Sequence, residues 1–188
     1  MLQLIPFNCL IFTNDELEDF DCEHKEINEY LKNEALKKDS SNTAKTFVLR
    51  DNENIVGFYT LTVGSLDVGN LETKTLIKQP IINLAYFAID KKYQRKGYGS
   101  LLMQEIFRSV SVISYYTGVE QIYLESVDDS VGFYESLGFQ LVTPNLKPED
   151  YEVATDNISF PMYISINTLL EQGYIGYSKN FENVKIKE

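Results

Sequence analysis

The stretch 81–102, IINLAYFAIDKKYQRKGYGSLL, decides the fold of this chain. Its first ten residues are almost continuously apolar, which is typical of a strand buried on both faces of a sheet. Four lysines and arginines follow within six positions, and Gly97 and Gly99 then precede a run with helical periodicity. The stretch therefore predicts a strand that leads through a basic, glycine-containing turn into a helix. Such an arrangement can hold a phosphate group.

The helix that follows the turn carries apolar residues along one side. We expect it to begin at Gly97 and to end near Gly118, because glycine is common just beyond a helix C-terminus. Its predicted buried stripe comprises Leu102, Ile106, Val110 and Ile113. The segment 121–125 is the next expected strand. Residues 81–125 therefore predict a βαβ unit with two parallel strands and a right-handed crossover.

The other segments up to residue 165 predict further strands and helices around this unit. Strands are expected over 2–10, 45–50, 55–63, 139–143 and 158–165. Helices or helical turns are expected over 21–38 with Asp21 as the cap, over 130–136, and over 168–172. We interpret 51–54 as a hairpin turn and 65–79 as a polar connection that Pro80 ends. The expected fold class is α/β.

Composition places the chain among soluble globular proteins. Of its 188 residues, 44% are hydrophobic and 24% are charged. No apolar run reaches the roughly 18–20 residues that cross a bilayer. Cys9 and Cys22 have no metal-binding spacing, which favours a reduced setting. His24 is the only histidine, so a multi-histidine metal site is excluded and a Ser-His triad is not expected. We expect a cytoplasmic protein that uses no metal and contacts no membrane.

The charge of the chain is unevenly distributed. A net charge of −11 creates a field that repels nucleic acid and anionic membranes. Lys91, Lys92, Arg95 and Lys96 nevertheless cluster at the predicted turn, where the helix N-terminus adds unpaired N–H groups and a partial positive charge. The turn can therefore bind an anion within an acidic protein.

Two glycines at a strand–helix turn are weak evidence for a ligand by themselves, because glycine also serves tight packing there. The spacing differs from the dinucleotide-binding Gly-x-Gly-x-x-Gly pattern, since Leu102 stands at the third position. It also differs from a P-loop, since no Gly-Lys-Ser/Thr follows. The basic cluster and the helix behind it favour a phosphate site over packing alone.

The turn and a second motif resemble the GNAT acetyltransferase family. Residues 94–99, QRKGYG, match the family's acetyl-CoA signature Gln/Arg-x-x-Gly-x-Gly/Ala, and 133–139, FYESLGF, match its downstream Phe-Tyr-x-x-x-Gly-Phe. The order of the elements expected over 2–165 is also similar. The resemblance implies a GNAT fold, with a mixed, mostly antiparallel central sheet, a parallel βαβ unit that forms the acetyl-CoA slot, and flanking helices. It assigns 1–165 to the acetyltransferase domain and 166–188 to a C-terminal extension without an assigned role.

The resemblance also implies acetyl-CoA as the cofactor and direct attack of a neutral amine on its thioester. Pantetheine would pair with the strand at Phe87, Ala88 and Ile89, and a main-chain N–H near Phe87 would polarise the thioester carbonyl. The pyrophosphate would lie on the amides from Arg95 to Ser100. The implied cofactor-binding residues are Phe87, Ala88, Ile89, Gln94, Arg95, Lys96, Gly97, Tyr98, Gly99, Ser100, Ser130 and Phe133.

Tyr134 and Glu125 are the candidate catalytic residues. A phenol with a pKa of about 10 can protonate a departing thiolate, so Tyr134 is the candidate general acid. The alternative is that Tyr134 only packs on the cofactor, but the flanking Phe133 and 137–139 favour catalysis. Glu125 can accept the amine proton through a water molecule, although a solvated strand end explains this residue equally well.

Several segments resemble one subgroup of the family, the GNAT toxins of toxin–antitoxin modules, which acetylate the amino group of aminoacyl-tRNA. Residues 127–130, VDDS, stand where many other members carry an Asn that contacts the cofactor. The segments 20–22, 56–61 and 84–90 are similar to the subgroup as well. The electrostatics differ, because Tyr86 replaces a basic residue of the subgroup and the predicted acceptor side is acidic. Its acidic residues lie within 15–23, at Glu125, Asp128 and Asp129, and within 149–156.

The sequence therefore predicts an N-acetyltransferase whose acceptor is the primary amine of a cationic small molecule, peptide or protein. The first alternative is a toxin-type enzyme that acetylates aminoacyl-tRNA, which the charge disfavours without excluding tRNA. The second alternative is a non-catalytic acyl-CoA-binding module, against which the retained Tyr134 argues. Homodimers are common in the family, so a homodimer is a further expectation.

Overall fold

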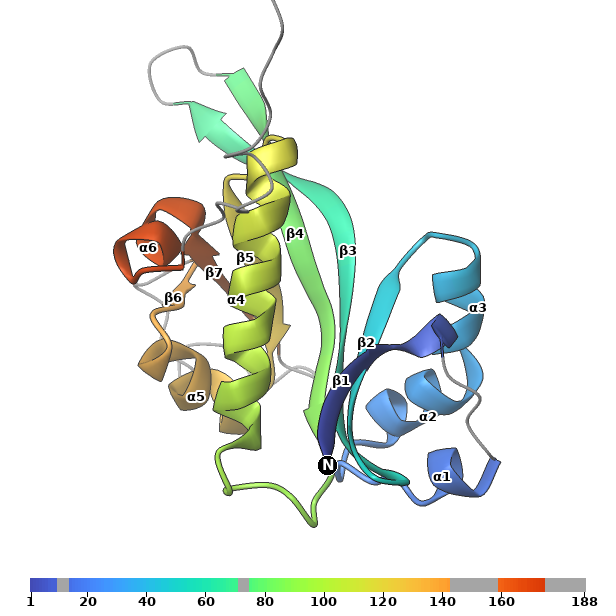
Figure 1. The fold of residues 1–188 in the computed structure, drawn as a ribbon. Coiled ribbons are helices and arrows are strands. Elements are labelled where there is room, and N and C mark those ends of the chain that lie inside the picture. The colour runs from blue at the N-terminus through green and yellow to red at the C-terminus, as the bar shows by residue number, and fades with distance from the viewer. Residues whose placement is uncertain (10–13, 71–74, 143–158, 175–188) are drawn as a thin grey trace, which may run out of the picture. The chain divides into compact units, whose positions relative to one another are not determined.

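The computed structural model describes residues 1–9, 14–70, 75–142 and 159–174, which form an α/β fold (Figure 1). Its strands are β1 Leu2–Pro6, β2 Lys45–Asp51, β3 Asn54–Asn70, β4 Thr75–Ile89, β5 Gln121–Ser126, β6 Gln140–Leu141 and β7 Phe160–Ser165. They form a seven-stranded sheet in the order β1-β2-β3-β4-β5-β7-β6, mostly antiparallel with one parallel pair. The α-helices are α1 Asn14–Glu18, α2 Lys25–Asn33, α3 Ala35–Ser40, α4 Tyr98–Tyr116, α5 Val131–Ser136 and α6 Ile166–Glu171, and 3-10 helices span Phe7–Cys9 and Asp128–Ser130. The expected fold class is confirmed.

The chain divides into two compact units, of which the first comprises residues 1–63 and 83–104. In it, β1 pairs antiparallel with β2, and β2 with β3. The register places Thr46 opposite Thr60, and their buried hydroxyls lie 2.9 Å apart. One buried hydrophobic cluster of this unit comprises Phe7, Phe20, Cys22, Tyr30, Leu31, Ala35, Val48, Ile55, Phe58 and Ala88. Because Ala88 belongs to this cluster, the cluster anchors the end of the strand that leads into the basic turn.

The second unit comprises residues 64–82 and 105–188. Here β7 pairs antiparallel with both β5 and β6. Alternate residues of the two longer strands, Ile122 and Leu124 on β5 and Met162 and Ile164 on β7, are at most 1% exposed. These side chains form one apolar face, as the two-residue period of a strand requires.

Helix α4 confirms the helix expected between Gly97 and Gly118. Of its predicted stripe, Leu102, Ile106 and Val110 are fully buried, and Ile113 is half-buried. In the described ranges, none of the helices combines the length and the hydropathy needed to span a bilayer.

The largest error of the sequence prediction concerns residues 65–79, which were expected to be a polar connection. Instead β3 continues to Asn70 and β4 begins at Thr75, so Pro80 lies within a strand. The side chains of Asp67 and Lys78 are exposed, and Lys78 Nζ lies 3.2 Å from the Asp67 carboxylate. The segment alternates briefly at Leu66 and Val68, but Val68, Leu76 and Ile77 remain exposed, so these strand ends have no continuous buried face that would mark them in the sequence.

The prediction of one helix over 21–38 is wrong, because the helix begins later and is divided in two. Helix α2 begins at Lys25, and Glu34 separates it from α3. Asp21 therefore does not cap it. The Asp21 carboxylate instead accepts a hydrogen bond from Asn28 Nδ2 at 2.9 Å, which holds the segment before the helix.

Several strand and helix bounds also differ from expectation. The strand expected over 2–10 ends at Pro6, because Phe7 begins a 3-10 helix and buries its ring in the core. Among the described residues 139–142, the strand is limited to Gln140–Leu141. Residues 10, 143 and 158, at the ends of expected strands, and the tail 175–188 lie outside the described residues.

Candidate active site

In the first unit, β4 ends at a tightly closed turn. Asp90 follows the strand, is only 2% exposed, and donates its main-chain N–H to the Val56 carbonyl at 3.0 Å. The Asp90 carbonyl accepts the N–H groups of Tyr93 at 2.8 Å and Gln94 at 3.1 Å. Gln94 Nε2 donates to the Ile89 carbonyl at 3.1 Å. The first residue of the QRKGYG motif therefore shapes the turn through its side chain.

The second half of the turn leaves open space before α4. Arg95 has φ +57 and Gly97 has φ +86, so the chain twice enters the left-handed region that favours glycine. Gly97 is exposed, and a Cβ placed on it would meet no atom within 4 Å beyond its chain neighbours. The first N–H groups of α4, from Tyr98 onward, have no acceptor within the helix. These amides and the space beside them fit a pyrophosphate group.

The four cations at the turn are not equivalent. Lys91 Nζ lies 2.7 Å from the Asp21 carboxylate and is neutralised by it. Lys96 Nζ donates to the Lys92 carbonyl at 2.6 Å, which leaves its charge uncompensated. Among the described residues, no ion pair involves Lys92, Arg95 or Lys96. The turn therefore has three cations without an ion pair rather than four.

The strand that precedes the turn packs closely on β3. A Cβ on Gly57 would lie 2.6 Å from the Ala88 carbonyl oxygen and 2.5 Å from Ile89 Cδ1, so only glycine permits this approach. Ala88 and Ile89 are buried, and Phe87 is half-buried. Gly57 thus sets the position of the strand segment along which the cofactor is expected to pair.

The second unit holds Tyr134 in an aromatic cluster. Tyr134 lies on α5, is 7% exposed, and has edge contacts to Phe133 and Phe139 with ring centroids 5.2 and 5.6 Å apart. Gly138, at φ +96, turns the chain after α5 so that the Phe139 N–H donates back to the Tyr134 carbonyl at 3.1 Å. The Phe-Tyr-x-x-x-Gly-Phe spacing therefore builds this cluster locally. Burial raises the pKa of the Tyr134 phenol well above its usual value, so the hydroxyl keeps its proton at neutral pH.

Glu125 and Ser130 also lie in the second unit. Glu125 is exposed near the end of β5, and its carboxylate accepts hydrogen bonds from the Tyr123 hydroxyl at 3.4 Å and from Ser159 Oγ at 3.1 Å. Ser130 occupies the N-cap position of α5, and its side chain makes no capping hydrogen bond. Glu125 therefore belongs to a hydrogen-bonded group, and the Ser130 hydroxyl is not used to cap the helix.

The sequence-predicted residues thus fall into two groups. Those within 87–100 lie in the first unit, whereas Glu125, Ser130, Phe133 and Tyr134 lie in the second. That both groups line one slot stays a prediction. Sequence reasoning missed the role of Gly57, although a lone glycine inside a strand-like run was an available signal.

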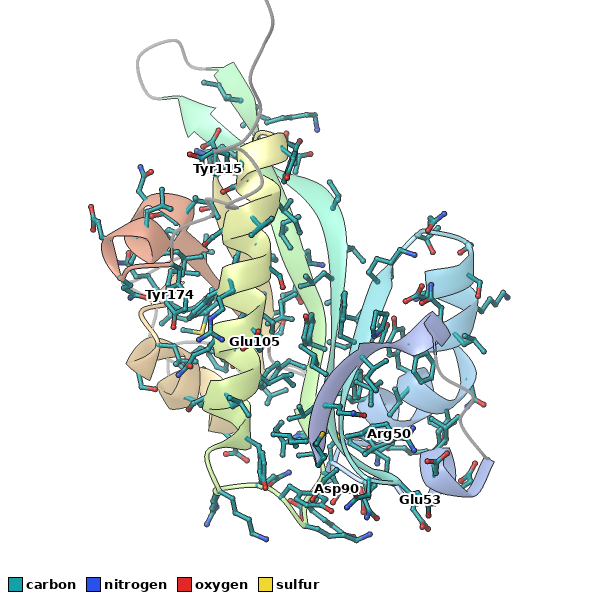
Figure 2. All side chains as sticks on the ribbon, in the orientation of Figure 1. Arg50, Glu53, Asp90, Glu105, Tyr115 and Tyr174 are labelled. Atoms are coloured by element: carbon teal, nitrogen blue, oxygen red, sulfur yellow. The ribbon has the colours of Figure 1, made fainter. Side chains whose placement is uncertain are left out.

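A pocket of about 300 Å³ adjoins the turn within the first unit. It is lined by Glu16, Asp19, Phe20, Glu53, Asn54, Ile55, Asp90, Lys92 and Tyr93. Two of its carboxylates are already engaged, since Glu16 pairs with Arg50 and Asp90 accepts main-chain N–H groups. Figure 2 labels Arg50, Glu53 and Asp90 in this part of the first unit. Part of the acidic segment 15–23 therefore faces a pocket next to the predicted phosphate site.

Comparisons with known proteins agree with this geometry. A model of the acetyltransferase (GNAT) domain matches residues 42–141. A tRNA-acetylating toxin of Mycobacterium tuberculosis is 25% identical over 132 residues, which are 68% of this chain and 80% of that protein. The crystal structure of a bacterial toxin covers 100% of this chain, and 99% of its own length, with a TM-score of 0.75 and 18% identity. The structure of AtaT complexed with acetyl-methionyl-tRNAfMet covers 92% of this chain and 99% of AtaT, with a TM-score of 0.71 and 18% identity. These two structures share the fold of this chain.

Proposed function

We propose that this chain, which belongs to the acetyltransferase (GNAT) family and is an acetyl-CoA-dependent N-acetyltransferase, acetylates the amino group of an aminoacyl-tRNA. We choose this acceptor because the chain is similar to the tRNA-acetylating toxin, and the similarity extends over 80% of that protein. The toxin-type alternative is therefore better supported than the cationic small-molecule or peptide amine that the sequence favoured.

The acidity of the chain limits how an RNA would be held. Lys32, Lys38 and Lys45, on α2, α3 and β2, each have a carboxylate oxygen within 3.1 Å. Because these three cations are already paired and the net charge of −11 repels the RNA backbone, we expect few backbone contacts along the RNA. Affinity would then come mainly from the aminoacylated end, and it would depend weakly on salt.

The residues of this chain supply binding and proton transfer. When bound, acetyl-CoA supplies a thioester carbonyl carbon that the acceptor amine attacks. The amides from Arg95 to Ser100 would hold the pyrophosphate, with Gly97 leaving room for it. Tyr134 would donate the proton of its hydroxyl to the sulfur as the thioester C–S bond breaks. Glu125 is the candidate that receives the amine proton through a water molecule.

The test is transfer of labelled acetyl from acetyl-CoA by the purified chain. The acceptors are an aminoacylated tRNA, the same tRNA after deacylation, and spermidine as a cationic amine. We expect label only in the aminoacylated tRNA, lost with Tyr134→Phe and retained with Tyr163→Phe, whose hydroxyl bonds to Gln140 on the exposed side of β7. Label in spermidine alone would overturn the tRNA proposal. Binding of acetyl-CoA without label in any acceptor would support the binding module.

A further inference from the structure

We propose that Asp90 is a positioning residue that pre-organises the phosphate-binding turn by holding it to the segment before α2. The inference rests on the proposed function, because it takes the turn 91–96 and the start of α4 to be the acetyl-CoA site. It adds a residue that binds no part of the cofactor and acts through the turn.

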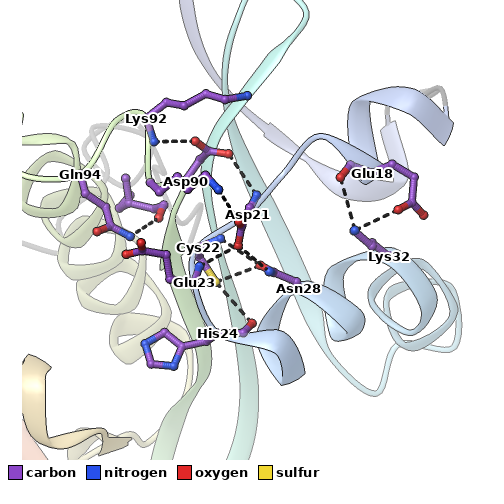
Figure 3. A network of polar contacts seen from close by, with 12 residues as sticks. Glu18, Asp21, Cys22, Glu23, His24, Asn28, Lys32, Asp90, Lys92 and Gln94 are labelled. Atoms are coloured by element: carbon purple, nitrogen blue, oxygen red, sulfur yellow. Dashed lines mark hydrogen bonds and ion pairs between the residues drawn. The ribbon is translucent and has the colours of Figure 1, made fainter.

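The Asp90 carboxylate joins two segments that are far apart in the sequence (Figure 3). Its Oδ1 accepts the main-chain N–H of Lys92 at 2.8 Å, within the turn. Its Oδ2 accepts the main-chain N–H of Asp21 at 3.1 Å, 69 positions away. The residue is 2% exposed, so water cannot readily replace either bond.

A second layer of contacts strengthens the same junction. The Lys91 N–H donates to the Asp21 carbonyl at 2.8 Å, and Lys91 Nζ lies 2.7 Å from Asp21 Oδ2. The Asp21 Oδ1 in turn accepts the N–H of Glu23 at 2.8 Å and Nδ2 of Asn28 at 2.9 Å. The Lys91 ammonium, followed by these two donors, holds the pKa of the Asp21 carboxyl well below its usual range. This layer is only partly buried, so solvent screens it more than it screens the buried Asp90 carboxylate, which is the stronger anchor.

The backbone conformation of the turn explains why an anchor is needed. It passes through the left-handed region at Arg95 and Gly97, and a non-glycine residue at φ +57 is costly unless its surroundings hold it. A turn that is already in place binds its ligand without first losing conformational entropy. If Asp90 is changed, this entropy must be lost on binding, and acetyl-CoA should bind more weakly.

The experiment measures acetyl-CoA affinity by calorimetry on the full chain, with Asp90→Asn and a matched control, Asp39→Asn. Asp39 is 1% exposed, and it accepts the Thr46 N–H at 3.0 Å and Lys45 Nζ at 3.1 Å. Both variants neutralise a buried aspartate that holds a main-chain N–H, so both should lower Tm. We expect Asp90→Asn to raise the Kd for acetyl-CoA about tenfold or more, well below its Tm, and Asp39→Asn to leave it unchanged.

Hydrogen exchange supplies a readout on the wild-type chain as well, in case Asp90→Asn folds poorly. We expect bound acetyl-CoA to slow exchange at the amides of both Lys92 and Asp21. Protection confined to the turn, or an equal Kd for Asp90→Asn and wild type, would overturn the inference while the proposed function stands. Equal weakening by Asp39→Asn would show a general loss of stability and would also overturn it. Wild type that fails to bind acetyl-CoA would overturn the proposed function and this inference with it.

Discussion

Replacing Gly57 with alanine tests whether the contact between β3 and β4 positions the strand expected to bind the cofactor. The new Cβ would lie 2.6 Å from the Ala88 carbonyl oxygen and 2.5 Å from Ile89 Cδ1, whereas ordinary Cβ contacts begin at 3.4 Å. The Ile89 methyl can rotate away from the new Cβ. The Ala88 carbonyl oxygen is part of the backbone, so it can move only if the strand moves. The end of β4 must therefore move by about 0.8 Å relative to β3.

Two magnitudes follow from that displacement. Overpacking of this kind costs about 1–3 kcal/mol, and each kcal/mol lowers Tm by about 2–4 °C in a chain of this size. A shift approaching about 1 Å in groups that orient a substrate can lower the rate about 100-fold. We therefore expect Gly57→Ala to lower Tm by several degrees and kcat/KM for acetyl transfer by about two orders of magnitude.

The assay combines thermal unfolding with acetyl transfer measured well below Tm. Gly64→Ala is the matched control on the same strand, because its Cβ would lie 3.4 Å from Ile81 Cγ1, an ordinary contact. We expect this control to resemble wild type. If Gly57→Ala matches Gly64→Ala in both Tm and kcat/KM, the close packing does not position β4 and the reasoning is refuted.

The other predictions concern the phosphate site and Tyr134. Gly97→Asp should abolish acetyl-CoA binding in calorimetry with an unchanged circular dichroism spectrum, because it adds negative charge to the site and strains the turn at φ +86. Gly118→Asp, at an exposed position beyond α4, should bind acetyl-CoA normally. Tyr134→Phe should lower kcat by about 10²–10⁴-fold in steady-state assays, and a smaller effect would contradict a role as general acid. Burial raises the pKa of Tyr134 in the folded state, so the stability it contributes is complete below the unfolded value of 10.0 and is lost as pH rises above it. Urea unfolding between about pH 8 and pH 11 should therefore show a steeper alkaline loss for wild type than for Tyr134→Phe, and equal slopes would count against the burial of the phenol.

The sequence alone determined the parts of this protein whose causes are local. The strand, basic turn and helix over 81–116 follow from neighbouring residues, because apolar runs, glycines and helical periodicity act over a few positions. The FYESLGF motif is local for the same reason, since Gly138 returns the chain onto Tyr134 within five residues. The family could therefore be inferred before any tertiary contact was known.

Which charges are free and which residues hold the turn depends on contacts between segments that are far apart in the sequence. Lys91 and Arg95 look alike in the sequence, yet Lys91 is neutralised by Asp21, 70 positions away. The sequence predicts Asp21 as a helix cap, but in the fold its main-chain N–H donates to the Asp90 carboxylate. Residues 65–79 were expected to be a connection, but they extend β3 and β4 with Val68, Leu76 and Ile77 exposed to solvent. In each case the partner or the solvent that fixes the residue's role lies outside its local sequence, so no local pattern could have revealed it.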